Sequence, residues 1–393
     1  MAMIERWYES MLKRFELRNY KNFKDPISIN FQDVAGYQFS ADCIADGLIS
    51  KMLIYGRNAT GKTNLGNAMM DIVTTLFPGR YVNEEIFLNA DATETYASFS
   101  YTFQFDEREV IYRYTRFSNL ELRDEELIID GIMIFKCSFF SEQYNFENLS
   151  YIDAETAITD RYLQSLDDGD SAEEIGDAKL PFLRWMINNV AMKRDSLLVN
   201  LSDFVRRMSM MKVSNIMMFR ARRLNDSFFE FLENQENLVD FEQFLNAMGI
   251  ECSLVLKKLP DGQKELYFSH ERLVPFYENA SSGTLALANL YRRCVSLWRN
   301  ASFIYLDEFD AFYHYEMAEN VVKFFKKKYP RCQMIMTTHN TNLMTNRLMR
   351  PDCLMILSRR GTLTALCNAT LRELREGHNL EKMYIGGEFE QYE

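Results

Sequence analysis

The chain has 393 residues, of which 47% are hydrophobic and 26% charged, and its formal net charge is −11 at pH 7. This composition excludes a disordered chain, and the negative charge argues against a protein whose main role is to hold bare DNA. No hydrophobic run approaches the roughly 20 residues that span a bilayer, and residues 1–14 lack the hydrophobic stretch of a signal peptide. The seven cysteines form no Cys-x-x-Cys pair, so neither a zinc site nor a disulfide framework is predicted. We expect a cytoplasmic protein.

The first part of the chain predicts a mixture of strands and one helix. Residues 51–55 form a short hydrophobic strand that ends at a glycine, and residues 62–76 place their leucine, methionine and isoleucine side chains on one face of a helix. Residues 95–140 are rich in alternating strand patterns, with a hairpin turn at Asp130 and Gly131. We therefore expect an α/β lobe that carries an antiparallel β subdomain.

The middle of the chain changes character. Residues 153–177 are acidic and rich in turn-forming residues, which is typical of a linker. Residues 181–248 repeat methionine, phenylalanine and leucine in a helical pattern, and no heptad repeat persists long enough for a long coiled coil. An acidic linker followed by a helical insert is the expected structure.

Strand patterns return in the last part of the chain. Residues 252–268 predict two strands around a hairpin turn, and residues 303–306 and 333–336 are hydrophobic runs typical of buried parallel strands. The predicted organisation has three parts: an N-terminal lobe at 1–150, a linker and helical insert at 151–250, and a C-terminal lobe at 251–393.

A glycine-rich motif lies between the hydrophobic strand and the first helix. Residues 56–63 fit the pattern G-x-x-x-x-G-K-[ST]. The glycines let successive backbone N–H groups point at phosphate oxygens, and the following helix presents its positive end to the same anion. Lys62 can then reach the β- and γ-phosphates, and the Thr63 hydroxyl can bind Mg²⁺. The predicted ATP-binding residues are Gly56, Arg57, Asn58, Ala59, Thr60, Gly61, Lys62, Thr63 and Asn64.

Polar residues follow two of the buried strands. Asp307 and Glu308 end the strand at 303–306, and His339 comes after the strand at 333–336. Because ligands bind at the carboxyl ends of parallel strands, these side chains are expected at the same edge as the phosphate loop. We predict that Asp307 binds Mg²⁺, that Glu308 polarises the attacking water, and that His339 hydrogen-bonds the γ-phosphate or that water.

Small hydroxyl residues open another helix. Ser281, Ser282, Gly283 and Thr284 precede a helical repeat of leucines. On its own this pattern indicates an N-cap, and such a helix start can also bind an anion.

Taken together and in this order, the four motifs resemble the ABC-related ATPase heads of the SMC, RecF and OLD families and of small bacterial anti-phage ATPases. Residues 56–63 resemble their Walker A loop, and Asp307 with Glu308 resembles their Walker B acids. His339 resembles their switch histidine. The opening stretch at 15–23 and the closing stretch at 382–389 are similar to the same group, the abortive-infection ATPases above all. The resemblance implies a P-loop NTPase of mixed α/β fold, like an ABC or SMC head, with ATP and Mg²⁺ as ligands.

The resemblance also implies a shared nucleotide site. In these families a signature motif of one subunit closes the site of another, so Ser281, Ser282 and Gly283 would act in trans in a dimer or higher oligomer. Ser282 stands where the family has its first glycine, and Thr284 where it has Gln or Glu. The remaining assignments by resemblance are Asp310 as a D-loop residue, Lys62 with Glu308 and His339 as catalytic residues, and Gln143 as the Q-loop glutamine.

Two functions fit these features. The first is an ATPase that senses a phage-derived trigger and controls a separate effector, a nuclease or a toxin, in bacterial anti-phage defence. The second is a DNA-repair ATPase of the RecF or SMC type, which binds DNA across the dimer and requires the basic residues at 326–331 to lie on the face where two heads meet. A transporter subunit fits the opening and closing stretches poorly, and no membrane partner is predicted.

Overall fold

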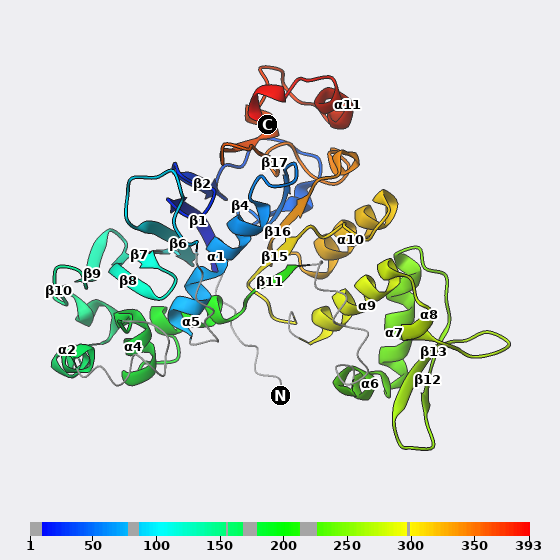
Figure 1. Ribbon diagram of the computed structural model, residues 1–393, viewed down its shortest axis with the longest axis horizontal. Coiled ribbons are helices and arrows are strands. Elements are labelled where there is room, and N and C mark those ends of the chain that lie inside the picture. The colour runs from blue at the N-terminus through cyan, green and yellow to red at the C-terminus, as the bar shows by residue number, and fades with distance from the viewer. Residues whose placement is uncertain (1–9, 78–85, 155, 168–178, 213–225, 297–298) are drawn as a thin grey trace.

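The computed structural model describes residues 10–77, 86–154, 156–167, 179–212, 226–296 and 299–393. Two large sheets form the body of the molecule, and a group of helices with a small sheet projects from one side (Figure 1). Within the described ranges, no helix has the length and hydrophobicity that crossing a bilayer would require.

The central sheet is mostly parallel, with strand order β11-β15-β16-β5-β17-β18. β5, β15 and β16 are buried at every residue, as expected for parallel strands covered on both faces. β18 alone runs antiparallel, against β17. The strands are β5 (Lys51–Tyr55), β11 (Met208–Lys212), β15 (Phe303–Asp307), β16 (Gln333–Thr338), β17 (Leu354–Leu357) and β18 (Leu363–Ala365).

The second sheet is antiparallel, with order β10-β9-β8-β7-β6-β1-β2. Its strands are β1 (Ser10–Arg18), β2 (Ile27–Asn30), β6 (Ala97–Phe105), β7 (Arg108–Ser118), β8 (Glu121–Ile129), β9 (Ile132–Ser138) and β10 (Gln143–Asn145). Along β6 every second side chain is buried, as expected when only one face of a sheet meets the core. Asp130 and Gly131 both have positive φ in the β8–β9 turn, so the predicted hairpin and antiparallel subdomain are confirmed.

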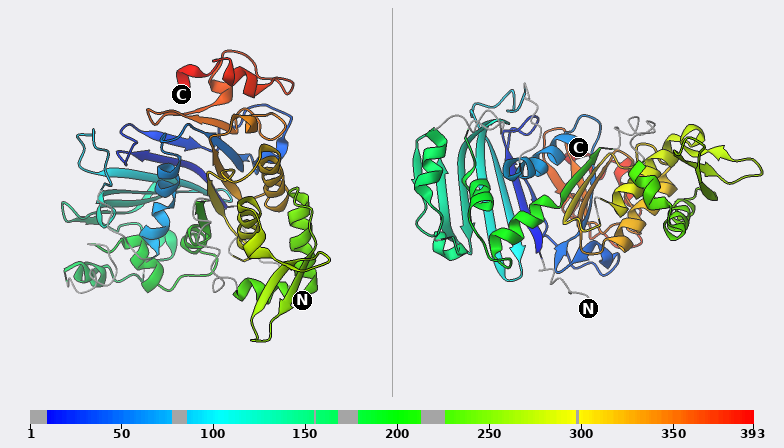
Figure 2. Two further views of the ribbon diagram at one scale, coloured as in Figure 1. Left: turned by 45° about the vertical axis from the view of Figure 1, so that its right-hand side comes forward. Right: turned by 90° about the horizontal axis from the view of Figure 1, so that it is seen from below.

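Helix α1 (Lys62–Leu76) lies between the two sheets, as the right-hand view of Figure 2 shows. On one side a Cβ at Gly66 would lie 2.5 Å from the Tyr305 ring of β15. On the other side the Tyr101 hydroxyl of β6 donates to the Ala68 carbonyl at 2.8 Å. The glycine therefore allows the close approach of α1 to the parallel sheet.

The remaining elements surround these three layers. Near the antiparallel sheet lie η2 (Leu149–Ile152), α2 (Thr159–Asp167), α4 (Phe182–Asn189) and α5 (Leu197–Arg206). The projecting group contains α6 (Asp226–Leu232), α7 (Gln235–Ala247), β12 (Leu254–Lys258), β13 (Lys264–Phe268), β14 (Val274–Pro275), α8 (Phe276–Asn279) and α9 (Ser282–Val295). The others are η1 (Ala41–Cys43), β3 (Ile44–Ala45), β4 (Leu48–Ile49), α10 (Tyr315–Lys328), η5 (Thr341–Leu343), η6 (Leu366–Asn368), α11 (Leu380–Ile385) and η7 (Glu390–Tyr392).

The expectation of helix throughout 181–248 is wrong at β11. Residues Met208–Lys212 form a strand that pairs in parallel with β15. A five-residue hydrophobic run does not distinguish strand from helix by its periodicity, so the partner strand decides. The segment 151–250 therefore returns to the parallel sheet, and it is not a purely helical insert.

Candidate functional site

The phosphate loop joins β5 to α1. Ala59 and Gly61 both have positive φ, and a Cβ at Gly61 would lie 2.1 Å from the Asn22 side-chain nitrogen, so only glycine fits there. Asn22 also donates to the Thr60 carbonyl at 3.1 Å and accepts from the Asn64 amide at 2.7 Å. Asn22, which sequence reasoning missed, thus supports the loop from the opening stretch at 15–23.

Lys62 lies inside this loop and is only 4% exposed. Its Nζ donates to the Gly56 carbonyl at 2.7 Å and to the Arg57 carbonyl at 3.1 Å, and it lies 3.9 Å from a Glu308 carboxylate oxygen. Burial lowers the pKa of Lys62, and the nearby Glu308 carboxylate opposes that shift. The loop therefore holds a buried cation where a phosphate would be bound.

Thr63 and Asp307 meet directly across the site. The Thr63 hydroxyl donates to Asp307 Oδ2 at 2.6 Å, and the Thr337 hydroxyl donates to Asp307 Oδ1 at 3.0 Å. A hydroxyl beside a buried carboxylate is the hard oxygen donor set that Mg²⁺ prefers, with further ligands supplied by water and substrate phosphates. These two side chains fit a magnesium ion.

Glu308 follows Asp307 with an unusual backbone. Its φ is 49°, in the left-handed region that non-glycine residues rarely adopt. Its N–H donates to the Thr337 hydroxyl at 2.8 Å, while its side chain is 39% exposed. Thr337 therefore connects both acids, and strain of this kind concentrates at functional sites. Sequence reasoning missed Thr337, although a polar pair at the end of a hydrophobic strand was a usable signal.

His339 and Asp310 lie at the same edge but differ in exposure. His339 follows β16 directly and is exposed. Asp310 is 5% exposed, accepts from the Thr338 hydroxyl at 2.7 Å, and has one buried oxygen, Oδ1, without a hydrogen-bond partner among the described residues. Burial raises the pKa of Asp310, and the hydrogen bond from Thr338 and, less strongly, the nearby His339 oppose that shift. Asp310, the predicted D-loop residue, thus points into the fold and supports β16, the strand that His339 follows.

Residues 281–284 form the beginning of α9. The Ser281 hydroxyl accepts from the Thr284 N–H at 3.1 Å, a typical N-cap, and both Ser281 and Ser282 are exposed. A Cβ at Gly283 would lie 2.8 Å from the Phe312 carbonyl oxygen. Gly283, one of the predicted signature residues, therefore packs against the segment that follows β15.

Gln143 lies away from these residues. It is exposed on β10, the edge strand of the antiparallel sheet, five strand positions from β1. At a strand spacing of ~4.8 Å that separation is about 24 Å. The structure does not bring Gln143 to the phosphate loop, so we no longer assign it to a Q-loop. Lys212, which was not among the predicted site residues, ends β11 in register with Asp307.

A phosphate loop that faces paired acids at the carboxyl edge of a parallel sheet defines a P-loop ATPase. Residues 51–345, most of the chain, match the family model described as "AAA domain, putative AbiEii toxin, Type IV TA system". The chain belongs to this family of ATPases.

Solved structures of SMC heads are similar to the chain at low sequence identity. The SMC head domain from Thermotoga maritima is 16% identical, with 90% of this chain and 98% of that chain covered and a TM-score of 0.43. The Pyrococcus furiosus Smc head with an extended coiled coil, bound to the C-terminal domain of ScpA, is 14% identical, with 97% and 100% covered and a TM-score of 0.45. No curated protein matches the chain.

Proposed function

We propose that the chain binds ATP and Mg²⁺ at residues 56–64 and 307, hydrolyses the ATP between two or more copies of itself, and thereby controls a separate effector. The observation that carries this proposal is the continuous set of contacts from Lys62 and Thr63 through Asp307 and Thr337 to Glu308. These contacts join the two nucleotide motifs, which lie far apart in the sequence, at one edge of the sheet.

The chain's own residues divide the chemistry between them. The loop N–H groups and the Lys62 ammonium bind the phosphates, and Thr63 with Asp307 holds the metal ion. Bound there, Mg²⁺ supplies charge neutralisation on the phosphate oxygens. Glu308 accepts a hydrogen bond from the attacking water and polarises it, while His339 donates to the γ-phosphate or positions that water. Thr337 keeps both acids in place.

The signature residues act on a second subunit in this proposal. Ser281 and Ser282 are exposed at the positive end of a 14-residue helix, which suits them to contact an anion outside their own subunit. Phe312 and Tyr315, 37% and 45% exposed, provide hydrophobic surface, and the Phe312 backbone lies beside Gly283. The nucleotide would then stabilise a dimer or higher oligomer by binding between its subunits.

The setting that we propose is bacterial anti-phage defence in the cytoplasm. The printed description of the family names a putative toxin of a type IV TA system. This supports an ATPase that works with a toxic component, so the chain would act as a sensor or scaffold for a separate nuclease or toxin and respond to a phage-derived trigger.

Replacement of Lys62 tests the proposed site. Lys62→Ala is expected to weaken ATP binding roughly 100-fold or more, because it removes the buried cation of the loop. Lys323→Ala is the matched control, since Lys323 is exposed on α10 and pairs with Glu319 at 3.2 Å. Calorimetric titration measures both. Normal ATP affinity in Lys62→Ala would overturn the proposed site.

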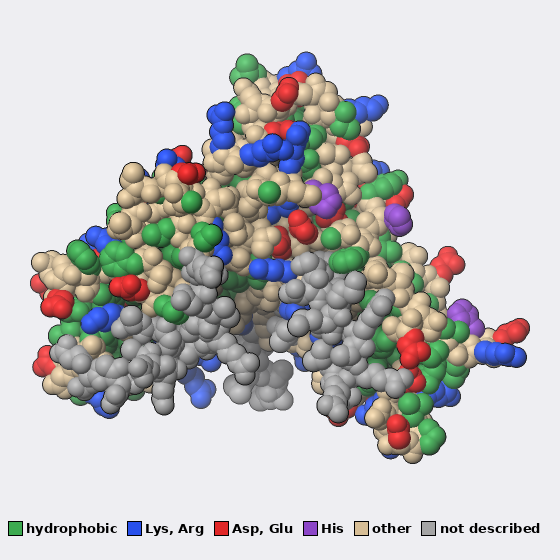
Figure 3. Space-filling view, in the orientation of Figure 1, with side chains coloured by type: hydrophobic (Ala, Val, Ile, Leu, Met, Phe, Trp, Pro, Cys, Tyr) green, Lys and Arg blue, Asp and Glu red, His purple; other side chains and the backbone are tan. Residues whose placement is uncertain are grey.

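The described basic residues at 326–331 do not support the DNA-repair alternative. Lys326 is 6% exposed, pairs with Asp42 at 2.7 Å and donates to the Leu348 carbonyl at 2.6 Å. Residues 326–331 comprise the last turn of α10 and the stretch that leads to β16, at the edge opposite the phosphate loop. The basic residues Arg220, Arg222 and Arg223 lie outside the described residues. On the face in Figure 3, acidic, basic and hydrophobic side chains of the described residues are interspersed.

A further inference from the structure

A second charged cluster joins the phosphate loop to the C-terminal segment at residues 380–393. Arg57, the second residue of the loop, forms an ion pair with the Glu393 carboxylate. The Arg57 side chain is 53% exposed and that of Glu393 15%. The C-terminal segment 380–393, which is drawn in red in Figure 1, thus reaches the loop itself.

Tyr384 completes this cluster from α11. It is 9% exposed, and its ring lies edge-on to that of Tyr55 at 4.8 Å, where β5 enters the loop. Its buried hydroxyl makes no hydrogen bond of ordinary geometry among the described residues, but it lies close enough to Arg57 and Glu393 to interact with both. The hydroxyl therefore belongs to the same polar cluster as the pair between Arg57 and Glu393.

Residues 380–389 are buried more deeply than residues 390–393. Leu380 and Phe389 are fully buried, and the Asn346 amide donates to three backbone carbonyls of residues 375–378. After Phe389, Tyr392 is partly buried against the core, and the polar contacts of this stretch are turn hydrogen bonds and the pair between Arg57 and Glu393. The residues after Phe389 can therefore move without exposing the two buried anchors.

Two anions compete for Arg57 if the loop binds a nucleotide. The loop collects positive charge from Lys62 and from its backbone N–H groups, and a guanidinium binds phosphate and carboxylate with the same paired N–H geometry. Glu393 presents a carboxylate to Arg57 at the border of that site. A phosphate close to this carboxylate is repelled by it until Arg57 changes partner.

We propose that Arg57 and Tyr384 form an anion site beside the phosphate loop, that the Glu393 carboxylate fills it in this structure, and that a nucleotide phosphate displaces Glu393. The proposal rests on the nucleotide site at 56–63. Binding of the nucleotide then releases residues 390–393 from Arg57. The exposed surface of the C-terminal segment therefore differs between the nucleotide-bound and the nucleotide-free protein.

A double-mutant cycle tests the competition. Glu393→Gln is expected to bind a non-hydrolysable ATP analogue about 2- to 5-fold more tightly, the range for a partly exposed ion pair. Glu390→Gln is the matched control, because it removes a negative charge from the same turn without touching Arg57, and its affinity should equal that of the wild type. In an Arg57→Gln background the gain from Glu393→Gln should disappear. Unchanged affinity in Glu393→Gln, or a gain that persists without Arg57, overturns the proposal.

Hydrogen exchange tests the displacement. The analogue is expected to speed amide exchange in residues 390–393 of the wild-type chain and to leave exchange around Leu380 unchanged. Exchange that stays the same throughout would overturn the displacement. If Lys62→Ala abolishes analogue binding while the Glu393 variants match the wild type, the nucleotide site stands and only this inference fails. A wild-type chain that does not bind the analogue would overturn both.

Discussion

The two ends of α1 meet opposite kinds of polar surroundings. At its beginning, Lys62 and Thr63 face acids at an edge of the sheet where Glu308 and His339 are exposed. Further along the helix, Asp71 and Thr75 meet Arg116 of β7, which is 1% exposed. The same helix therefore carries charges available to a ligand at one end and charges enclosed by the fold at the other.

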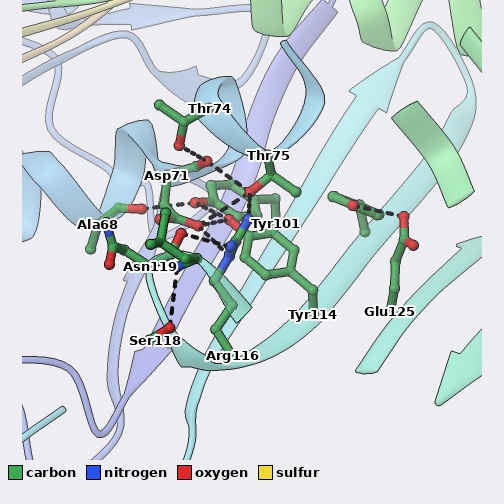
Figure 4. A network of polar contacts seen from close by, with 12 residues as sticks. Ala68, Asp71, Thr74, Thr75, Tyr101, Tyr114, Arg116, Ser118, Asn119 and Glu125 are labelled. Carbon is green, nitrogen blue, oxygen red and sulfur yellow. Dashed lines mark hydrogen bonds and ion pairs between the residues drawn. The ribbon is translucent and has the colours of Figure 1, made fainter. Parts of the chain in front are cut away.

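The enclosed network attaches α1 to the antiparallel sheet (Figure 4). Arg116 pairs with the Asp71 carboxylate at 3.3 Å and donates to the Thr75 hydroxyl at 2.8 Å. The Tyr114 hydroxyl donates to the same carboxylate at 2.7 Å, and Tyr101 donates to the Ala68 carbonyl at 2.8 Å. The polar groups of this network hydrogen-bond one another inside the protein, so replacing them should lower the stability of the fold. Replacing the site residues at the phosphate loop should lower ATP turnover instead.

Glu125 extends the enclosed network toward α4. Its carboxylate accepts from the Tyr112 hydroxyl at 2.9 Å and from the backbone N–H groups of Phe182 and Leu183 at 2.7 and 3.0 Å. Phe182 and Leu183 are the first residues of α4, where a carboxylate also meets the positive end of the helix. A single buried acid therefore connects β8 to the helix that follows the linker.

The largest expected effect is on ATP turnover, at the beginning of α1, where the Glu308 side chain is 39% exposed. Glu308→Gln should lower ATP turnover by roughly 100- to 10,000-fold, because it removes the group that polarises water, while ATP binding remains. A nucleotide-bound oligomer should then accumulate, which light scattering detects. Glu316→Gln, an exposed acid on α10, is the control and should keep normal turnover. Full turnover in Glu308→Gln would exclude Glu308 as the group that polarises water. It would also remove the expected functional difference between the two ends of α1.

At the enclosed end we expect a loss of stability. Arg116→Ala should lower the free energy of unfolding by about 3–5 kcal/mol, because it leaves the Asp71 carboxylate buried without its cation. Arg113→Ala removes a half-exposed arginine from the same strand, paired with Glu126 at 3.3 Å, and should cost no more than about 1 kcal/mol. Denaturant unfolding measures the free energy of unfolding of both variants. Equal losses in Arg116→Ala and Arg113→Ala would contradict a special stabilising role of the enclosed Arg116.

The smallest effect is a dependence on pH. Burial raises the pKa of Glu125 to about 7, above its usual acidic range. The folded state therefore binds a proton that the unfolded state has released, so this contribution to stability is complete below the unfolded pKa and is lost as pH rises through about 7. Relative to Glu125→Gln, the wild type should lose up to ~1.4 kcal/mol per pH unit in this range.

Urea unfolding at pH 5.5, 6.5 and 7.5 checks the sign of this effect. Glu126→Gln, the neighbouring acid on β8, is the matched control. If the stability difference between wild type and Glu125→Gln does not change with pH, then Glu125 does not titrate in this window, and the enclosed end lacks the pH sensitivity proposed for it.

Much of the fold could be predicted because it is local in the sequence. The alternation in β6, the hydrophobic runs of β5, β15 and β16, and the turn at Asp130 and Gly131 each depend on neighbouring residues. The phosphate loop is also local, since its spacing alone brings glycines, lysine and threonine to one helix start. These features were predicted correctly as structure, while the roles of the site residues stay predictions.

The sequence by itself therefore determined the elements, the phosphate loop and the acids that follow a buried strand. Only the tertiary structure decided that β11 joins the parallel sheet, that Gln143 lies at a remote edge and that Thr337 supports both acids. The physical reason is separation along the chain. Thr63 and Asp307 lie 244 positions apart, and no local periodicity records which distant strand a short hydrophobic run will pair with.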